Sequence, residues 1–453
     1  MRLEIIQHPD STFQELMDFK RDVRDESCHP SSFVISKEVP EGQLLFQTLT
    51  CEMVLACKGQ EDMSKDEYLR EHLFVVPESL DEKKFADQYR TLRKMIDTVD
   101  DENITSSYTI MTTTDCNARC FYCYEKGRSR IPMSEKTAMK VASLIKRNNT
   151  KLPKDNKEVN LRWFGGEPLY NGKVIDLICS ELEKSGVPFK SSMTSNGYLF
   201  DDDTVKRAVN LWKLQKVQIT LDGTEDIYNR SKAFIYDGAA SPYQRVVRNI
   251  GLLLDAGIKV SVRLNLGLHN ADDLFALVRS LSDLYGGRKD FGCYAHVLFE
   301  ESAGSGNVRQ TDESRRQVYE KLEQLESLMA DLGIKGKDAS LPKEARQNWC
   351  MADSGKSLMI APTGDIGLCE HYSEDHFISH VNSPDVVDKA MVAEFRQRRE
   401  EIELCNNCPV YPQCIRLKMC GESTNCTPEK VENQVNQIKF AMVRTYEKYR
   451  SGK

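Results

Sequence analysis

The sequence predicts an α/β protein whose centre is a parallel sheet folded into a partial, TIM-like (β/α)6 barrel. Between residues 105 and 335, short apolar and β-branched runs alternate with longer amphipathic runs, as in consecutive βαβ units. Residues 1–104 lack this alternation, and residues 345–453 contain seven of the fifteen cysteines. We therefore expect a small N-terminal α+β domain, the barrel, and a cysteine-rich C-terminal domain.

Composition excludes several classes of protein. The chain has 453 residues, of which 40% are hydrophobic, so it can bury a sizeable core. A net charge of −7 provides no basic field for nucleic acid or anionic lipid. No long apolar run spans a membrane and no signal peptide opens the chain, so we expect a cytoplasmic protein.

Residues 1–104 are expected to begin with a β-hairpin, because residues 33–35 and 44–46 flank a turn signal at 39–42. Residues 50–56 either extend the second strand or begin a helix. Ser64 is expected to cap a helix that reaches His72, and an amphipathic helix is expected at 80–96. Strands followed by short helices indicate a winged-helix-like module.

The barrel is expected to place its functional residues at the carboxyl ends of its strands. Strands are predicted at residues 107–111, 159–164, 191–195, 217–221, 259–266 and 294–299. Helices are predicted from Ser134 onward and at residues 174–184, 243–256, 271–284 and 311–332.

Three cysteines follow the first predicted strand at the spacing C-x3-C-x2-C: Cys116, Cys120 and Cys123. Thiolates this close together allow a short loop to hold an iron–sulfur cluster. A [4Fe–4S] cluster needs four ligands, so its fourth iron is left free for another ligand. A zinc knuckle is the alternative, but zinc prefers four N/S ligands and no fourth Cys or His lies near.

This spacing resembles that of the radical S-adenosylmethionine (SAM) enzymes. The resemblance implies that the amino and carboxylate groups of SAM bind the open iron. It also implies that the reduced cluster splits SAM into methionine and a 5′-deoxyadenosyl radical. Tyr122 would then stack beside the adenine.

Gly165, Gly166 and Glu167 follow the second strand and are similar to the family's Gly-Gly-Glu motif. Two glycines let the backbone approach a ligand closely, and their carbonyls with the Glu167 carboxylate can accept from an ammonium group. The resemblance implies that these residues bind the amino group of SAM.

Two further motifs end the third and fourth strands. Ser195 and Asn196 suit ribose hydroxyls or the methionine carboxylate, although alone they describe an ordinary turn. Thr220 opens Thr-Leu-Asp-Gly, which resembles the family's Ser-Leu-Asp-Gly, where the hydroxyl residue contacts SAM. Arg230 or Arg263 would pair with the SAM carboxylate, and an ordinary surface arginine is the alternative for Arg230.

The C-terminal cysteines resemble a SPASM extension, which in that family carries two auxiliary [4Fe–4S] clusters. The resemblance assigns the first cluster to Cys350, Cys369 and Cys420. It assigns the second to Cys405, Cys408, Cys414 and Cys426. The C-x5-C gap before Cys420 departs from the usual C-x3-C, and zinc sites are the alternative. With the SAM-binding cluster, three [4Fe–4S] clusters are expected.

Glu370 directly follows Cys369. In the related sulfatase-maturing enzymes an acidic residue after this cysteine takes a substrate proton, so the resemblance implies a catalytic base. A solvated acid near a cluster is the alternative.

The function that we expect is maturation of a ribosomally made peptide, in which hydrogen abstraction leads to a C–S, C–C or C–O cross-link. Residues 1–104 resemble the leading segment of such enzymes, which binds the precursor's leader by strand addition. Phe164 precedes Gly-Gly-Glu where sulfatase-maturing relatives usually carry Gln. Flavodoxin or ferredoxin would supply electrons to a monomer or homodimer. The alternatives are a sulfatase-maturing enzyme and a zinc-stabilised peptide-binding scaffold.

Overall fold

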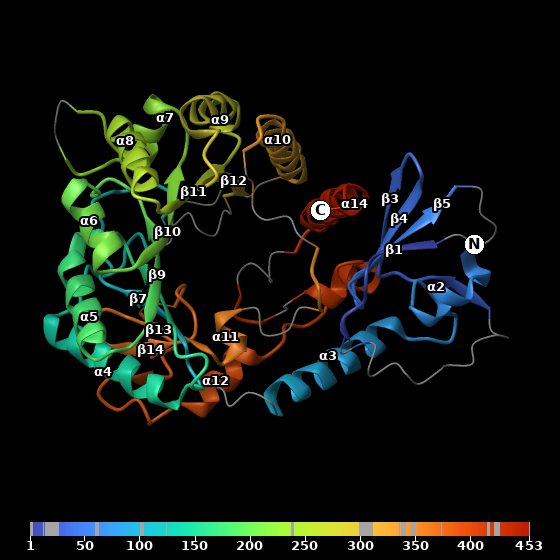
Figure 1. The fold of residues 1–453 in the computed structure, drawn as a ribbon, viewed down its shortest axis with the longest axis horizontal. Helices are drawn as coiled ribbons and strands as arrows, with labels where there is room; N and C mark the ends of the chain where they lie inside the picture. The colour runs from blue at the N-terminus through green and yellow to red at the C-terminus, as the bar shows by residue number, and fades with distance from the viewer. Residues whose placement is uncertain are drawn as a thin grey trace. The chain divides into compact units, whose positions relative to one another are not determined.

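The computed structural model describes residues 3–11, 13, 27–58, 63–99, 104–123, 125–236, 240–298, 311–334, 336, 341–345, 350–372, 374–414, 417–420 and 426–452. The chain forms two compact units (Figure 1). The first comprises Met1–Glu102, Asp338–Ser354 and Glu394–Lys453, and the second comprises Asn103–Lys337 and Gly355–Ala393. No helix in the described part of the chain is long and apolar enough to cross a membrane.

The second unit is built on a sheet in which six parallel strands follow one another in sequence order, as predicted. The strands are β7 (Ser107–Met111), β8 (Val159–Phe164), β9 (Phe189–Ser195), β10 (Leu214–Leu221), β11 (Lys259–Leu266) and β12 (Phe291–Val297). The last strand begins three residues before the predicted start at Tyr294, and the predicted end at Phe299 lies outside the described residues.

Helices connect these strands, which is how parallel strands are joined. They are α4 (Glu135–Lys151), α5 (Gly172–Lys184), α6 (Asp202–Asn210), α7 (Glu225–Lys232), α8 (Pro242–Asp255), α9 (Ala271–Tyr285) and α10 (Asp312–Asp331). Figure 1 shows α4, α5 and α6 along one side of the sheet. Ser134 caps α4 as predicted, accepting from the Thr137 amide at 3.0 Å. Helices α6 and α7 were not predicted.

The two faces of the sheet differ in polarity because side chains alternate along each strand. On β8, Leu161 and Trp163 are fully buried, whereas Arg162 between them is partly exposed. The same alternation on β10 and β11 leaves Thr220 and Arg263 partly exposed, and these two residues are register partners. One face therefore packs against helices, and the other presents polar groups.

A seventh parallel strand comes from beyond residue 337. Strand β13 (Ser357–Ile360) pairs with β7, with Met359 opposite Thr109. Strands β14 (Asp365–Gly367) and β15 (Ser379–His380) continue the sheet in antiparallel fashion. Residues 355–393 therefore extend the barrel sheet, although they follow the predicted end of the barrel.

The first unit contains a four-stranded antiparallel sheet of order β1-β5-β4-β3. Its strands are β1 (Leu3–Gln7), β3 (Val34–Val39), β4 (Gly42–Gln47) and β5 (Glu52–Cys57), and β2 (Cys28–Pro30) pairs separately with β6 (Val75–Pro77). The predicted hairpin is confirmed, with Val39 opposite Gly42 at its turn. Residues 50–56 were expected to extend the second strand or to begin a helix, and both alternatives are wrong: residues 52–57 form a separate strand, which turns back to pair antiparallel with β4.

The helix predicted between Ser64 and His72 is divided. A short 3-10 helix, η1 (Met63–Lys65), precedes α2 (Glu67–Glu71). The cap of α2 is Asp66 and not Ser64, because the Asp66 carboxylate accepts from the Leu69 amide at 3.1 Å. The second predicted helix is α3 (Glu82–Val99).

The C-terminal residues share a core with this N-terminal sheet. Helix α14 (Pro428–Arg450) contributes Met442 and Tyr446 to a buried cluster with Leu44, Phe46 and Met53. The other short elements of the C-terminal part are α11 (Met351–Ser354), α12 (Lys389–Arg396), η4 (Glu403–Asn407) and η5 (Tyr411–Gln413). The first and last parts of the chain therefore form one body.

Replacing Trp163 with alanine should destabilise the second unit by about 3–5 kcal/mol, because it removes a fully buried indole from the helix-facing side of β8. Urea unfolding measures the loss. The control is Lys216→Ala on exposed β10 surface, which should change stability by less than about 0.5 kcal/mol. Equal effects of the two variants would contradict this assignment of the core.

Candidate active site

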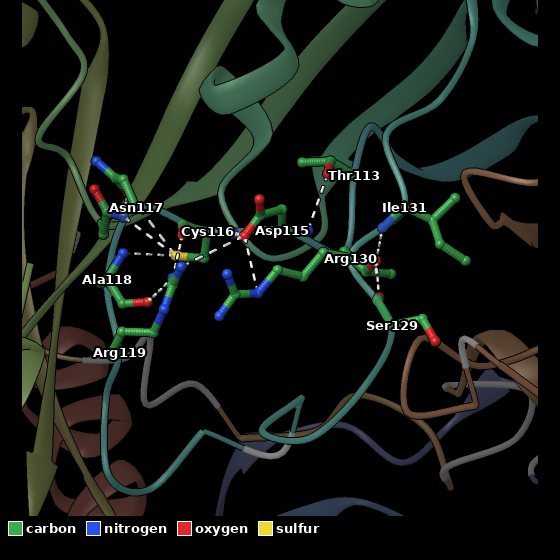
Figure 2. Close-up of polar contacts among 11 residues, drawn as sticks. Thr113, Asp115, Cys116, Asn117, Ala118, Arg119, Ser129, Arg130 and Ile131 are labelled. Atoms are coloured by element: carbon green, nitrogen blue, oxygen red, sulfur yellow. Dashed lines mark hydrogen bonds and ion pairs between the residues drawn. The ribbon is translucent and has the colours of Figure 1, made fainter. Parts of the chain in front are cut away.

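The predicted cysteine loop begins where β7 ends, and local hydrogen bonds fix its first turn (Figure 2). The Asp115 amide donates to the Thr113 hydroxyl at 2.9 Å, and the Cys116 amide donates to the Asp115 carboxylate at 2.8 Å. The Ala118 amide points at the Cys116 sulfur, 3.3 Å away. An N–H directed at a cysteine sulfur stabilises its thiolate form.

The Gly-Gly-Glu segment after β8 pairs with this loop through its backbone. The Gly166 amide donates to the Thr113 carbonyl, and the Glu167 amide donates to the Asp115 carbonyl, both at 3.0 Å. A Cβ on Gly166 would lie 2.3 Å from the Asp115 carbonyl oxygen. Gly165 has φ +133°, a backbone conformation that residues with a side chain rarely adopt. The two glycines are therefore required by the close approach of two backbones.

The Glu167 carboxylate is fully buried and accepts three hydrogen bonds. The donors are the Leu169 amide at 3.1 Å, the Ser195 hydroxyl at 2.9 Å and the Asn196 amide at 2.8 Å. Burial nevertheless raises the pKa of Glu167 from 4.5 to about 7, against the lowering effect of these donors. Glu167 thus joins the ends of β8 and β9, and its contacts with the described residues use three of its roughly four lone-pair positions.

Asn196 connects the end of β9 to the cysteine loop. Its Nδ2 donates to the Asn117 side-chain oxygen at 2.7 Å and lies 3.7 Å from the Cys116 sulfur. The sequence predicted Ser195 and Asn196 as ligand contacts. In the structure, Asn196 also contacts the loop itself, whereas the Ser195 hydroxyl donates to Glu167.

A buried ionic network lies on the other side of the loop. The Tyr122 hydroxyl donates to Asp222 Oδ2 at 2.7 Å, and Lys232 Nζ lies 2.7 Å from that hydroxyl and 3.1 Å from the same Asp222 oxygen. Asn265 donates to Asp222 Oδ1 at 3.0 Å. Sequence reasoning quoted Asp222 within its motif but gave it no role. It missed Lys232, which no sequence pattern distinguishes from other helix-end lysines.

The remaining predicted cofactor contacts occupy different environments. Thr220 and Arg263 are neighbours on the polar face of the sheet, and the buried Arg263 Nε has no hydrogen-bond partner in the described parts of the chain. Burial raises the pKa of the nearby Tyr294 hydroxyl, while the positive charges of Arg263 and Arg162 act to lower it. Arg230 is exposed on α7, where its Nε donates to the Asp226 carbonyl at 3.3 Å. Of the two arginines, Arg263 is the one with an unsatisfied buried donor.

Glu370 pairs with an arginine of the polar face. Its Oε1 lies 2.9 Å from Arg162 Nη1. The Arg162 guanidinium lies over the Phe164 ring, with Cζ 4.9 Å from the ring centroid. The Glu370 side chain is 16% exposed. The predicted base is therefore held next to β8 by a fixed cation.

The donor set of the loop fits an iron–sulfur cluster. Burial raises the pKa of Cys116 to about 12, with further contributions from Glu167, Cys120 and Cys123. Burial likewise raises the pKa of the Cys120 and Cys123 thiols, and the Lys232 charge opposes it. Three neighbouring, partly buried thiols with a buried cation suit an anionic cluster. The fit concerns the chemistry of these residues and not their present arrangement, because no three His, Cys, Asp or Glu side chains among the described residues are arranged as a metal site.

The predicted auxiliary cysteines divide between the two units. Cys405, Cys408, Cys414 and Cys426 all belong to the first unit. Burial raises the pKa of Cys408 to about 11, and the charges of Cys426, Cys414 and Cys405 raise it further, so the four thiols influence one another. For the other predicted set, Cys350 and Cys420 belong to the first unit and Cys369 to the second. Both ligand assignments stay predictions.

Comparison with known proteins identifies the central part of the chain. Residues 110–281 match the model of the radical SAM superfamily, so the chain contains a radical SAM domain. This stretch includes the cysteine loop, the Gly-Gly-Glu segment and the buried network around Asp222. Enzymes of this superfamily use SAM and a [4Fe–4S] cluster, which agrees with the predicted cofactors. No curated protein matches the chain significantly.

Several solved structures have folds similar to that of this chain. Native anSMEcpe with bound AdoMet aligns with a TM-score of 0.57 at 14% identity, over 76% of this chain and 99% of that one. Native anSMEcpe with bound AdoMet and Cp18Cys peptide aligns with a TM-score of 0.56 at 15% identity, over 77% and 100%. Streptococcus suis SuiB bound to precursor peptide SuiA reaches a TM-score of only 0.49 at 12% identity, over 86% and 94%. At such identity the likeness concerns the fold.

Gly166→Ala should lower SAM cleavage about 100-fold, because the added Cβ would displace the Asp115 carbonyl and separate the Gly-Gly-Glu segment from the cysteine loop. Deoxyadenosine formation by the reconstituted protein measures the effect. The control is Gly172→Ala at the start of α5, where an added Cβ meets no atom within 4 Å. Parent-like cleavage in Gly166→Ala would contradict the structural role of Gly166.

Glu167 should make the stability of the second unit fall as the pH rises from 4.5 to about 7. Since its pKa is higher in the folded protein, the folded state binds more protons than the unfolded state in this window. The expected loss is on the order of 3 kcal/mol and is complete above the folded-state pKa. Urea unfolding across the window measures it. Glu167→Gln should show a shallower pH dependence, and an unchanged slope would refute the assignment.

Proposed function

We propose that the protein is a radical SAM maturase that acts on a ribosomally made precursor peptide and forms an intramolecular cross-link in it. The observation that carries this proposal is the convergence of three strand ends on the cysteine loop. Gly166 and Glu167 after β8, Asn196 after β9, and Asp222 after β10 each contact the segment from Thr113 to Tyr122. Parallel strands gather catalytic groups at their carboxyl ends in this way.

Cys116, Cys120 and Cys123 would hold a [4Fe–4S] cluster, and SAM bound there would supply the radical chemistry. The carbonyls of the Gly-Gly-Glu segment and the remaining lone pair of Glu167 would accept from the SAM ammonium group. Arg263 would donate to the SAM carboxylate, for which its buried Nε is available. The remaining parts of SAM would contact Ser195, Asn196, Thr220 and Tyr122. Arg230 is exposed on α7 and donates to the Asp226 carbonyl, so Arg263 is the better candidate for the SAM carboxylate.

Glu370 would accept the substrate proton. The Arg162 guanidinium fixes the orientation of this carboxylate through their 2.9 Å ion pair. A carboxylate held on the polar face of the sheet is within the part of the fold where the radical chemistry would occur. Loss of a hydrogen atom and a proton from the substrate, with an electron passed to an auxiliary cluster, balances a cross-link that removes two hydrogens.

The first unit would bind the precursor and carry auxiliary clusters. In its sheet, β1 and β3 are the edge strands, and an edge strand can pair with an extended leader peptide. Cys405, Cys408, Cys414 and Cys426 would hold one [4Fe–4S] cluster, and Cys350, Cys369 and Cys420 the other. A flavodoxin or ferredoxin would deliver electrons.

A sulfatase-maturing function is the second candidate, and the fold likeness to anSMEcpe with bound Cp18Cys peptide favours keeping it. Incubation with a Cys-x-Pro-x-Arg peptide separates the two candidates. Formylglycine formation on this peptide would support the second. Anaerobic co-expression with a candidate precursor, followed by mass spectrometry, should show loss of two hydrogens for each cross-link. A colourless, zinc-containing protein would instead indicate a peptide-binding scaffold.

The decisive experiment compares the parent with a variant in which Cys116, Cys120 and Cys123 are all alanine. Anaerobically reconstituted parent plus SAM and dithionite should yield 5′-deoxyadenosine, and the triple variant should yield none, because the cluster has lost its ligands. Cys179→Ala serves as the matched control, since Cys179 is buried in α5 away from the loop. Deoxyadenosine from the triple variant, or none from the parent, would refute the proposed function.

A further inference from the structure

Lys232 is the only lysine that is buried within the described parts of the chain, with 3% of its surface exposed. It is the last residue of α7. A buried ammonium group is costly unless it is paired and hydrogen-bonded. Its burial inside the radical SAM domain therefore depends on the partners that surround its ammonium group.

The side chain of Lys232 connects two motifs. Its Nζ lies 2.7 Å from the Tyr122 hydroxyl, within the cysteine loop, and 3.1 Å from Asp222 Oδ2, at the end of β10. Tyr122 in turn donates to the same Asp222 oxygen at 2.7 Å. The three groups form a closed, buried triangle, so moving one of them breaks two contacts.

The main chain of Lys232 holds the same loop at a second point. Its carbonyl accepts from the Arg119 amide at 2.8 Å and lies 4.0 Å from the Cys120 sulfur. The segment between Arg119 and Tyr122 is thus fixed at both ends by one residue, with Cys120 between the two contacts. Helix α7 positions this segment through its final residue.

The charge of Lys232 also bears on electron transfer. A cluster bound by three thiolates is negative, and its reduction adds a further negative charge. A buried cation nearby makes reduction easier, because net charge and burial set the potential of iron–sulfur clusters. The same charge is poorly screened, since it is separated from solvent.

We propose that Lys232 is a positioning residue for the SAM-binding cluster. Lys232 holds the Arg119–Tyr122 segment and raises the reduction potential of the cluster. This inference rests on the proposed function, because it requires the cluster to bind at Cys116, Cys120 and Cys123. It gives Lys232 a role that differs from the cluster-binding and SAM-binding roles proposed above for other residues.

The test is an EPR-monitored redox titration of anaerobically reconstituted protein, with iron and labile sulfide measured in parallel. The SAM-binding cluster is identified as the one whose spectrum changes when SAM is added. Lys232→Met should shift its midpoint potential to a more negative value. Lys232→Arg should restore the potential, because it keeps the charge. Lys206→Met, on an exposed part of α6, should leave the potential unchanged.

Tyr122→Phe separates the positioning role from the charge. It removes the hydroxyl that joins Lys232 to the loop but leaves the pair between Lys232 and Asp222. The variant should bind less iron, or give a broadened EPR signal with SAM, without the negative shift of Lys232→Met. A parent-like iron content and line shape would overturn the positioning part of the proposal.

Asp222→Asn provides a second measurement if Lys232→Met does not fold or bind iron. It removes the negative partner and leaves the ammonium group, so the potential should move to a more positive value. Unchanged potentials in loaded variants would overturn the inference and leave the proposed function intact. A parent protein without iron or without a SAM-dependent spectrum would overturn the proposed function, and the inference with it.

Discussion

The candidate site depends on two backbone hydrogen bonds between neighbouring strand ends. The amides of Gly166 and Glu167 donate to the carbonyls of Thr113 and Asp115, and this pairing requires glycine at position 166, because a Cβ would meet the Asp115 carbonyl. Once the two segments are paired, the Glu167 carboxylate is buried and must find donors, which β9 provides. The position of the cysteine loop therefore follows from the register of the parallel sheet and not from the loop sequence alone.

Buried charged side chains in the second unit also depend on specific partners. Two buried charged groups near the loop are paired or hydrogen-bonded: Lys232 with Asp222, and Glu167 with three donors. On the polar face, Arg162 is paired with Glu370, while the Arg263 Nε has no partner among the residues that the structure describes. The proposed function assigns this buried nitrogen to the carboxylate of SAM, because a guanidinium matches a carboxylate in charge and geometry.

The first unit combines segments that are remote in sequence. The Gln413 side chain donates to the Thr48 carbonyl at 2.6 Å, and the Thr48 hydroxyl donates to the Pro409 carbonyl at 2.6 Å. These bonds tie the region of Cys408 and Cys414 to the turn between β4 and β5. The segment that contains Cys408 and Cys414 is thus held by hydrogen bonds to the N-terminal sheet. The geometry of the predicted auxiliary cluster therefore depends on that sheet.

Sequence by itself determined the six parallel strands and most of their bounds, because alternation of β-branched and amphipathic runs is a local property. It also identified Cys116, Gly166 and Glu167, whose spacing along the chain carries the signal. It did not predict that residues 355–393 extend the barrel sheet, or that Lys232 meets Tyr122. Only the tertiary structure decided these, because they depend on contacts between residues about one hundred or more positions apart, such as Met359 with Thr109 and Lys232 with Tyr122. Such pairings leave no periodic pattern in the chain, since each partner alone is an ordinary strand residue or helix-end lysine.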